Sequence, residues 1–286
     1  MNILSIQSWV AYGHVGNSSA VFPLQRLGAE VWAINTVQFS NHTGYGSWRG
    51  QVFGADLVHD LVQGVADRGV LDRCDAVLSG YMGDATIGDA ILSATTRVKA
   101  ANAQAIYCCD PVIGDKGRGI FVRAGIPEFI RDQAVPLSDI LTPNQFELEW
   151  MTGRKIQTLD DAKTAVETLR AAMAADGPRV VLVTSLELGE TPGDCIEMLA
   201  AGPDGYFRIR TPRLPLSVNG AGDAIAALFL FHRLRSLSTA TALSRAASSI
   251  YGILRRTCEA GSREILTVAA QDEFVVPSHV FDPEPC

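Results

Sequence analysis

The segment Asn219-Gly220-Ala221-Gly222-Asp223 joins small residues to a carboxylate directly before a strongly apolar stretch. Small residues let backbone N–H groups approach an anion closely, and a helix N-terminus adds a favourable dipole. A carboxylate at that position can accept the proton of a hydroxyl group that attacks a phosphate. The segment therefore indicates phosphoryl transfer with Asp223 as the base, although these residues alone fit a glycine-rich turn before a helix equally well.

A second candidate is the acidic segment 110–117, which follows an apolar run and contains Asp110 and Asp115. Carboxylates on a glycine-containing loop could hold Mg²⁺ through water or lie against nucleotide phosphates. Taken alone, the segment favours a plain acidic turn.

Polar residues also follow two further apolar runs. Thr142, Asn144 and Glu147 begin an expected helix, in which Asn144 and Glu147 would form a capping box. Alternatively, Asn144 and Glu147 point back at a metal ion and its water shell. Thr184 and Ser185 could bind nucleotide phosphates or simply end a strand.

Residues 41–46 have the composition of a mobile loop, in which His42 is expected to face solvent rather than to act as a base. Three aromatic residues near these loops, Trp9, Tyr12 and Trp48, could stack on a flat ring or serve only packing.

These candidates must be positioned by strands and helices that alternate along the chain. Expected strands cover residues 3–8, 30–37, 75–79, 105–110, 140–142 and 179–184. Several are almost continuously apolar, as parallel strands covered on both faces are. Helical spacing is clearest after Thr158, where apolar residues recur at steps of three and four. The alternation predicts a three-layer α/β/α fold with a mostly parallel central sheet and flanking helices.

The pattern changes after residue 184. A hairpin is expected over residues 195–210, followed by helices over 221–234 and 239–256. The first of these helices is apolar almost all round and should be buried. No stretch separates two folding units, so one domain over residues 1–286 is expected, with the tail after Pro277 on the surface.

Ligands of open parallel sheets bind beyond the carboxyl ends of the strands. Ser8, Asp110, Thr142 and Thr184 all stand at or just before such ends, so polar side chains should gather at one edge of the sheet.

The formal net charge of −7, without a Lys/Arg cluster, disfavours nucleic acid and anionic membrane surfaces as partners. No segment has the apolar length of a membrane span or the form of a signal peptide. Six cysteines without a Cys-x-x-Cys pair do not indicate a disulfide framework or a metal cluster. We expect a cytoplasmic protein with small-molecule partners.

Together these segments resemble the pyridoxal kinase family of the ribokinase-like superfamily. The resemblance runs from Met1 to about Arg256, and it is most specific in residues 35–43, Asn-Thr-Val-Gln-Phe-Ser-Asn-His-Thr. The Gly-x-Gly-Asp segment at 220–223 marks only the superfamily. The resemblance implies transfer of the γ-phosphate of ATP, with Mg²⁺, to the 5′-hydroxyl of pyridoxal, and usually of pyridoxine and pyridoxamine. Homodimers and a response to K⁺ are further family traits.

The resemblance also implies roles for single residues. By position, Asp223 resembles the catalytic base of the family. Gly220, Ala221 and Gly222 resemble the residues that form the anion hole around the transferred phosphoryl group. On the acceptor side the corresponding residues are Ser8, Thr43, Gly44 and Tyr81. On the nucleotide side they are Asp110, Asp115, Thr142, Asn144, Glu147, Thr184 and Ser185, with Asp110 and Glu147 on the metal.

Two residues and one loop depart from the family pattern. Thr184 stands where many bacterial members have Lys, Gly44 replaces a larger polar residue, and the loop from Pro212 to Asn219, which should cover the nucleotide base, is short. The main alternative activity is a hydroxymethylpyrimidine kinase of thiamine synthesis. A sugar kinase and a non-catalytic protein that binds the vitamer fit the sequence less well.

Overall fold

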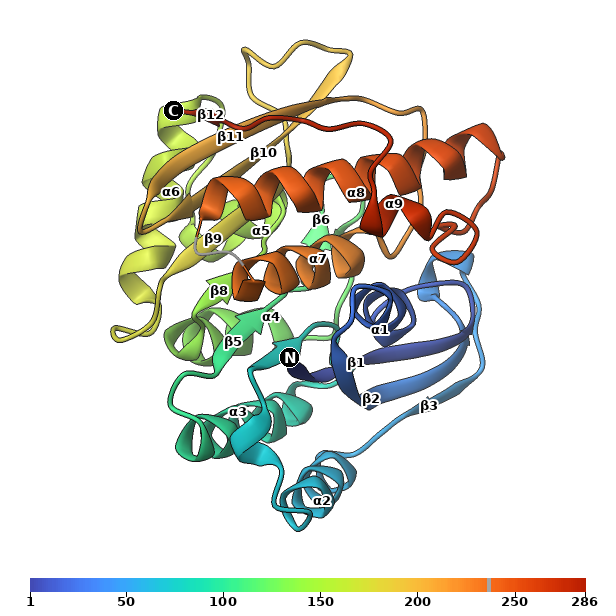
Figure 1. The fold of residues 1–286 in the computed structure, drawn as a ribbon, viewed down its shortest axis with the longest axis vertical. Helices are drawn as coiled ribbons and strands as arrows, with labels where there is room; N and C mark the ends of the chain where they lie inside the picture. Colours follow the sequence, from blue (N-terminus) through green and yellow to red (C-terminus); the bar gives the residue numbers. More distant parts are fainter. Residues whose placement is uncertain (236–237) are drawn as a thin grey trace.

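A ten-stranded sheet runs through the computed structural model, which describes residues 1–235 and 238–286 (Figure 1). Its strands, in chain order, are β1 (Asn2–Tyr12), β2 (Glu30–Asn41), β3 (Gly50–Val52), β4 (Ala76–Ser79), β5 (Ile106–Cys109), β8 (Ile140–Leu141), β9 (Val180–Leu186), β10 (Cys195–Gly202), β11 (Gly205–Pro212) and β12 (Glu284–Pro285). Across the sheet the order is β12-β11-β10-β9-β8-β5-β4-β1-β2-β3.

The six central strands β2, β1, β4, β5, β8 and β9 are parallel, and the strands at both edges are antiparallel. Parallel strands carry their side chains alternately to two covered faces. In β1, for example, Ile3 belongs to one buried cluster and Leu4 to the other. Val180 and Val181 of β9 divide in the same way.

Helices cover both faces of the sheet (Figure 1). One face carries α1 (Asn17–Arg26), α7 (Ala221–Arg235), α8 (Thr239–Glu259) and α9 (Asp272–Val275). The other carries α2 (Ala55–Ala66), α3 (Ala85–Ala101), α4 (Ile126–Phe129), α5 (Gln145–Thr152) and α6 (Leu159–Ala172). Short turns of helix cover Thr43–Tyr45, Leu71–Arg73, Ile130–Ala134 and Val135–Leu137. The three-layer α/β/α fold predicted from the sequence is confirmed.

Helix α7 is buried on every side from Ala224 to Phe231, because it lies between the sheet and the helices α1 and α8. The expected buried central helix is therefore confirmed. Its packing places the N-terminus of α7 at the edge of the sheet where the parallel strands end. The Thr158–Asp161 capping box at the start of α6 is also present.

Three segments differ from the sequence-based expectations. Strands β1 and β2 continue to Tyr12 and Asn41, with a register irregularity between Gln7 and Trp9. The acidic segment expected as a loop or turn contains the two-stranded hairpin of β6 (Gly114–Asp115) and β7 (Gly119–Ile120). The tail after Pro277 lies on the surface, as expected, but it also forms the unexpected strand β12, which pairs with β11.

The C-terminal tail is also fixed to α8. The Phe281 backbone N–H donates to Ser248 Oγ at 3.0 Å, and the Phe281 ring lies 4.9 Å from that of Tyr251, centroid to centroid. Among the described residues, no helix is both long and apolar enough to span a bilayer.

Candidate active site

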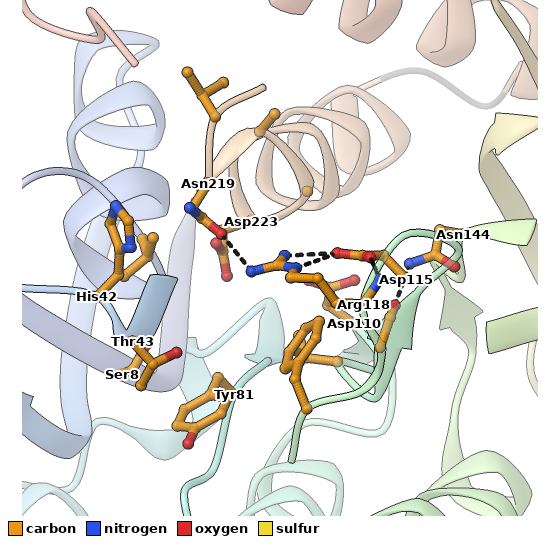
Figure 2. A pocket seen from close by; sticks show the side chains of 18 of the residues that line it. Ser8, His42, Thr43, Tyr81, Asp110, Asp115, Arg118, Asn144, Asn219 and Asp223 are labelled. Atoms are coloured by element: carbon orange, nitrogen blue, oxygen red, sulfur yellow. Dashed lines mark hydrogen bonds and ion pairs between the residues drawn. The ribbon is translucent and has the colours of Figure 1, made fainter. Parts of the chain in front are cut away.

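Two adjoining cavities open at the carboxyl edge of the parallel strands. The inner one, of about 300 Å³, holds most of the candidate residues, and the outer one, of about 840 Å³, extends over α8 and the loop before α7. They share His42, Asp115, Arg118, Asn144, Thr184, Ser185, Val218, Asn219, Ala221 and Gly222. Figure 2 shows the inner cavity, whose labelled side chains come from both halves of the chain.

The N-terminus of α7 forms one wall of both cavities. Gly220 has φ +89°, and a Cβ there would overlap the carbonyl oxygen of His14, so only glycine fits. Ser19 Oγ donates to Gly220 O at 2.8 Å, which fixes the turn against α1. A Cβ on Gly222 would meet no atom within 4 Å, so that side of the turn is open to a ligand. The turn can therefore offer backbone N–H groups and a helix dipole to an anion.

Asp223 lies in the first turn of α7 and lines the inner cavity. Burial raises the pKa of its carboxyl above the ordinary value, while a hydrogen bond from the Gly16 backbone N–H acts in the opposite direction. A carboxylate with raised proton affinity is a better acceptor for the proton of a hydroxyl group than an ordinary surface aspartate.

Asp110 and Glu147 form an acidic wall of the same cavity. Burial, and secondarily the charge of Asp223, raise the pKa of Asp110 to about 7, although Thr142 Oγ1 donates to it at 2.8 Å. Burial and the charge of Asp110 raise the pKa of Glu147 well above its usual range. Burial and the charge of a neighbouring carboxylate thus both disfavour the ionised forms of Asp110 and Glu147.

Both interpretations of Asn144 and Glu147 have structural support. Asn144 caps α5 and the capping box is complete, with the Asn144 N–H donating to Glu147 Oε2 at 2.9 Å. Glu147 Oε1 also accepts from the backbone N–H groups of Ile113 and Gly114, at 2.9 and 3.4 Å. Both side chains nevertheless line the inner cavity.

The acidic wall has a composition that suits Mg²⁺. A cation beside Asp110 and Glu147 would stabilise their ionised forms, which burial and, secondarily, the charges of neighbouring carboxylates disfavour. The described residues contain no group of three or more His, Cys, Asp or Glu that could hold a metal by themselves. Mg²⁺ commonly binds through one or two carboxylates and completes its shell with water and substrate phosphates, so two carboxyl groups suffice.

Thr184 and Ser185 lie where β9 meets both cavities. The pairing of β9 with β10 shifts register here, and Ser185 has φ +51°, which is uncommon for a residue with a side chain. The bulge leaves the Ser185 side chain exposed while Thr184 stays buried. Such strained residues concentrate at functional sites.

Ser8, Thr43 and Tyr81 line the inner cavity together with the ring of Phe39. Ser8 lies at the irregularity of β1 and is buried, and burial raises the pKa of the Tyr81 hydroxyl. Gly44 lies outside this cavity and lines the outer one.

The hypothesis that Trp9, Tyr12 and Trp48 stack on a bound ring is not supported, because none of the three lines either cavity. Tyr12 is 62% exposed and packs against Tyr45, while Trp48 packs against Phe39.

The segment expected as a mobile loop is an anchored turn. Glu264, from the segment after α8, accepts from Tyr45 Oη at 2.6 Å and lies 3.0 Å from His42 Nε2. Its other oxygen accepts from the His14 backbone N–H at 3.3 Å. His42 lines both cavities with its Nε2 held by this carboxylate, which favours a positioning role over that of a base. The sequence reasoning did not identify Glu264.

Arg118 is a second residue that the sequence reasoning missed. It stands between β6 and β7, and its Nε donates to Asp115 Oδ2 at 2.7 Å (Figure 2). Its Nη1 donates to Asn219 Oδ1 at 3.2 Å. The only sequence signal is its place between Gly117 and Gly119 in the acidic segment.

The chain is similar to known proteins over most of its length. Residues 48–268 match the family model described as phosphomethylpyrimidine kinase. The chain is 65% identical to pyridoxal kinase PdxY of Granulibacter bethesdensis over the whole of both chains. It is 58% identical to pyridoxal kinase PdxY of Rubrobacter xylanophilus, over 97% of this chain and 94% of that one.

Solved structures of pyridoxal kinases also have a fold similar to that of this chain. The pyridoxal kinase of Leishmania donovani in complex with ADP and ginkgotoxin superposes with a TM-score of 0.91 at 27% identity, covering 99% of both chains. Its complex with ADP and pyridoxine superposes with a TM-score of 0.90.

Proposed function

This chain is an ATP-dependent kinase of the pyridoxal kinase family, with the ribokinase-like fold, and we propose that Asp223 is the general base of its phosphoryl transfer. The observation that carries the proposal is the half-buried Asp223 carboxyl in the inner cavity, beside an open, glycine-lined helix N-terminus. The 5′-hydroxyl of pyridoxal would lie against this carboxylate. Gly220, Ala221 and Gly222 would form the anion hole around the transferred group.

The acceptor ring would occupy the inner cavity. Ser8 and Thr43 supply hydroxyl groups for the polar atoms of the pyridine ring, and Tyr81 and Phe39 supply flat apolar surface. Gly44 would contribute by leaving room between the two cavities, because a Cβ there would crowd the side chains of His42 and Asn219.

The nucleotide would extend from the inner into the outer cavity. Apolar residues of the loop before α7 and of α8, among them Leu214, Leu216 and Leu254, suit a flat base. Asp115, Thr142, Asn144, Thr184 and Ser185 would lie along its phosphates. Asp110 and Glu147 would hold Mg²⁺, whose chemistry is to neutralise charge on the phosphate oxygens.

Several properties rest on the family alone. A homodimer, a response to K⁺, a cytoplasmic location and activity on pyridoxine and pyridoxamine belong to the proposal. The continuous sheet from β3 to β12 supports one domain over residues 1–286.

The test is a coupled kinase assay with MgATP and a panel of pyridoxal, pyridoxine, pyridoxamine and hydroxymethylpyrimidine. The last is included because the matching family model is described as phosphomethylpyrimidine kinase. Turnover should be greatest with pyridoxal. Turnover of hydroxymethylpyrimidine without any vitamer would reject the acceptor, and binding without turnover would indicate a non-catalytic protein.

The same assay tests the base. Asp223→Asn should lower kcat by about 10²–10⁴-fold, the usual contribution of general base catalysis, with little change in the Kd of pyridoxal. A variant with nearly normal kcat would show that another group accepts the proton.

A further inference from the structure

Arg118 is the one Lys or Arg side chain among the described residues that line the inner cavity. It also lines the outer cavity, so it lies where the phosphates of a nucleotide would pass between the two. The rest of the inner cavity carries the carboxyl groups Asp110, Asp115, Glu147 and Asp223.

The guanidinium lies at the edge of the proposed anion hole. Its Nη1 is 3.2 Å from the side-chain oxygen of Asn219, the residue directly before Gly220. On the other side it forms an ion pair with Asp115, with Nη2 2.6 Å from Oδ2. Figure 2 shows Arg118 between these two partners and facing the cavity that contains Asp223.

The present partners of Arg118 are easily exchanged. The side chains of Arg118 and Asp115 are 48% and 34% exposed, and ion pairs in such solvated positions contribute little free energy. A phosphoryl group would compete well, because guanidinium groups bind phosphate oxygens with two parallel hydrogen bonds.

The hairpin itself does not depend on the guanidinium. Asp115 Oδ1 accepts from the backbone N–H groups of Gly117 and Arg118, at 3.0 and 2.8 Å, and these bonds hold the turn. Removal of the Arg118 side-chain charge should therefore leave the backbone of the hairpin in place, so a kinetic effect can be separated from a folding effect.

We propose that Arg118 is a catalytic residue that turns from Asp115 to the transferring phosphoryl group and stabilises its negative charge in the transition state. The inference rests on the proposed function. In the step, the bond between the 5′-oxygen and the γ-phosphorus forms while the bond from that phosphorus to the β,γ-bridging oxygen breaks. ADP leaves with the electron pair of the bridging oxygen, and the hydroxyl proton passes to Asp223. Arg118 donates hydrogen bonds throughout and loses no proton.

The experiment compares Arg118→Met and Arg118→Lys with a matched control, Arg131→Met. Arg131 also forms a two-bonded pair with an aspartate, Asp132, has a similar exposure of 43% and lies over an aromatic ring, but it lines neither cavity. Arg118→Met should lower kcat at least about 100-fold, in the range known for arginines that stabilise phosphoryl transfer, with much smaller changes in the KM of pyridoxal and MgATP.

A residue with only a structural role would not be rescued by a free cation. We therefore expect added guanidinium ion to restore part of the kcat of Arg118→Met and to leave Arg131→Met unchanged. Arg118→Lys should retain an intermediate rate. The proposal is overturned if Arg118→Met keeps kcat within about threefold of the parent, or if its loss is accompanied by an equal loss in Arg131→Met.

The two proposals fail differently. If the parent protein itself does not phosphorylate any acceptor of the panel, the proposed function fails. If the parent turns over pyridoxal and Arg118→Met does so equally well, only the role of Arg118 fails.

Discussion

At the scale of single residues, the site is defined by carboxyl groups that line one cavity together. Asp110, Glu147 and Asp223 all have pKa values raised by burial, and Asp110 interacts electrostatically with both of the others. Such an arrangement destabilises the empty protein and is relieved when positive charge enters. It is the pattern expected of a site built for a cation-bound, phosphate-bearing substrate.

The raised pKa of Asp110 predicts a pH dependence of stability. The pKa of this carboxyl is about 7 in the folded protein, above its ordinary value of 3.8, so the folded state holds the proton more tightly. This contribution to stability is complete below about pH 4 and is lost as the pH rises to about 7. The Asp110→Asn variant has no titrating group at this position. Between about pH 4 and pH 7, the unfolding free energy of the parent should therefore fall by about 2–4 kcal/mol relative to that of the variant.

Urea unfolding of the parent and of Asp110→Asn at a series of pH values, without Mg²⁺ or nucleotide, measures this difference. A difference that stays constant between pH 4 and pH 8 would contradict the raised pKa.

At the scale of elements, the turn Thr43–Tyr45 illustrates how a loop becomes part of a site. Glu264 fixes it through Tyr45 and His42, and the same carboxylate reaches the backbone of His14 before α1. The guanidinium of Arg263 lies 5.0 Å from the centroid of the Tyr45 ring and lines the outer cavity. The turn Thr43–Tyr45 and the outer cavity are thus joined through two consecutive residues, Arg263 and Glu264.

We expect Glu264→Ala to raise the KM of pyridoxal about 10–100-fold, because hydrogen bonds to a buried charged group contribute about 1.5–3 kcal/mol to the position of the turn. The Kd of a nucleotide analogue should change much less. Steady-state kinetics and calorimetry measure the two constants. Glu259→Ala, which removes an exposed carboxylate at the end of α8, is the control. Equal losses in the binding of both ligands would indicate general unfolding rather than displacement of the turn.

The helices and strands that are marked by nearby residues could be predicted from the sequence. The six parallel strands, the buried helix α7 and the capping box of α6 follow from apolar periodicity and from capping residues. Glu264 could not be predicted, because its partner His42 lies 222 residues away and nothing local marks it. Arg118 looks like any surface arginine between glycines, and only the folding of the hairpin over the cavity gives it a role. The surface position of the tail was predicted correctly, but its pairing with β11 was not, because this pairing depends on a strand far away in sequence.

At the scale of the whole molecule, the C-terminal tail closes one edge of the sheet and supports α8. Phe281 contacts Tyr251, and Tyr251 in turn lines the outer cavity. The tail therefore affects a binding site that it does not touch.

A chain that ends at Pro277 lacks β12 and Phe281. It should lose about 2–4 kcal/mol of unfolding free energy, the cost of removing a packed aromatic residue with its neighbours, and should bind nucleotide more weakly than the parent. Thermal unfolding with and without ADP measures both effects. Val280→Ala, at a position that is 70% exposed, should change neither. A shortened chain as stable as the parent would show that the tail is dispensable.

The link between His42 and Glu264 also has a consequence for synthesis on the ribosome. The chain grows from its N-terminus at about 5–20 residues per second, so Glu264 follows His42 by roughly 10–40 s. During that interval β1 and β2 can pair, but the turn Thr43–Tyr45 lacks its contacts with Glu264. A growing chain can thus assemble its first strands early, whereas the turn that brings His42 and Thr43 to the inner cavity becomes anchored only after Glu264 has been synthesised.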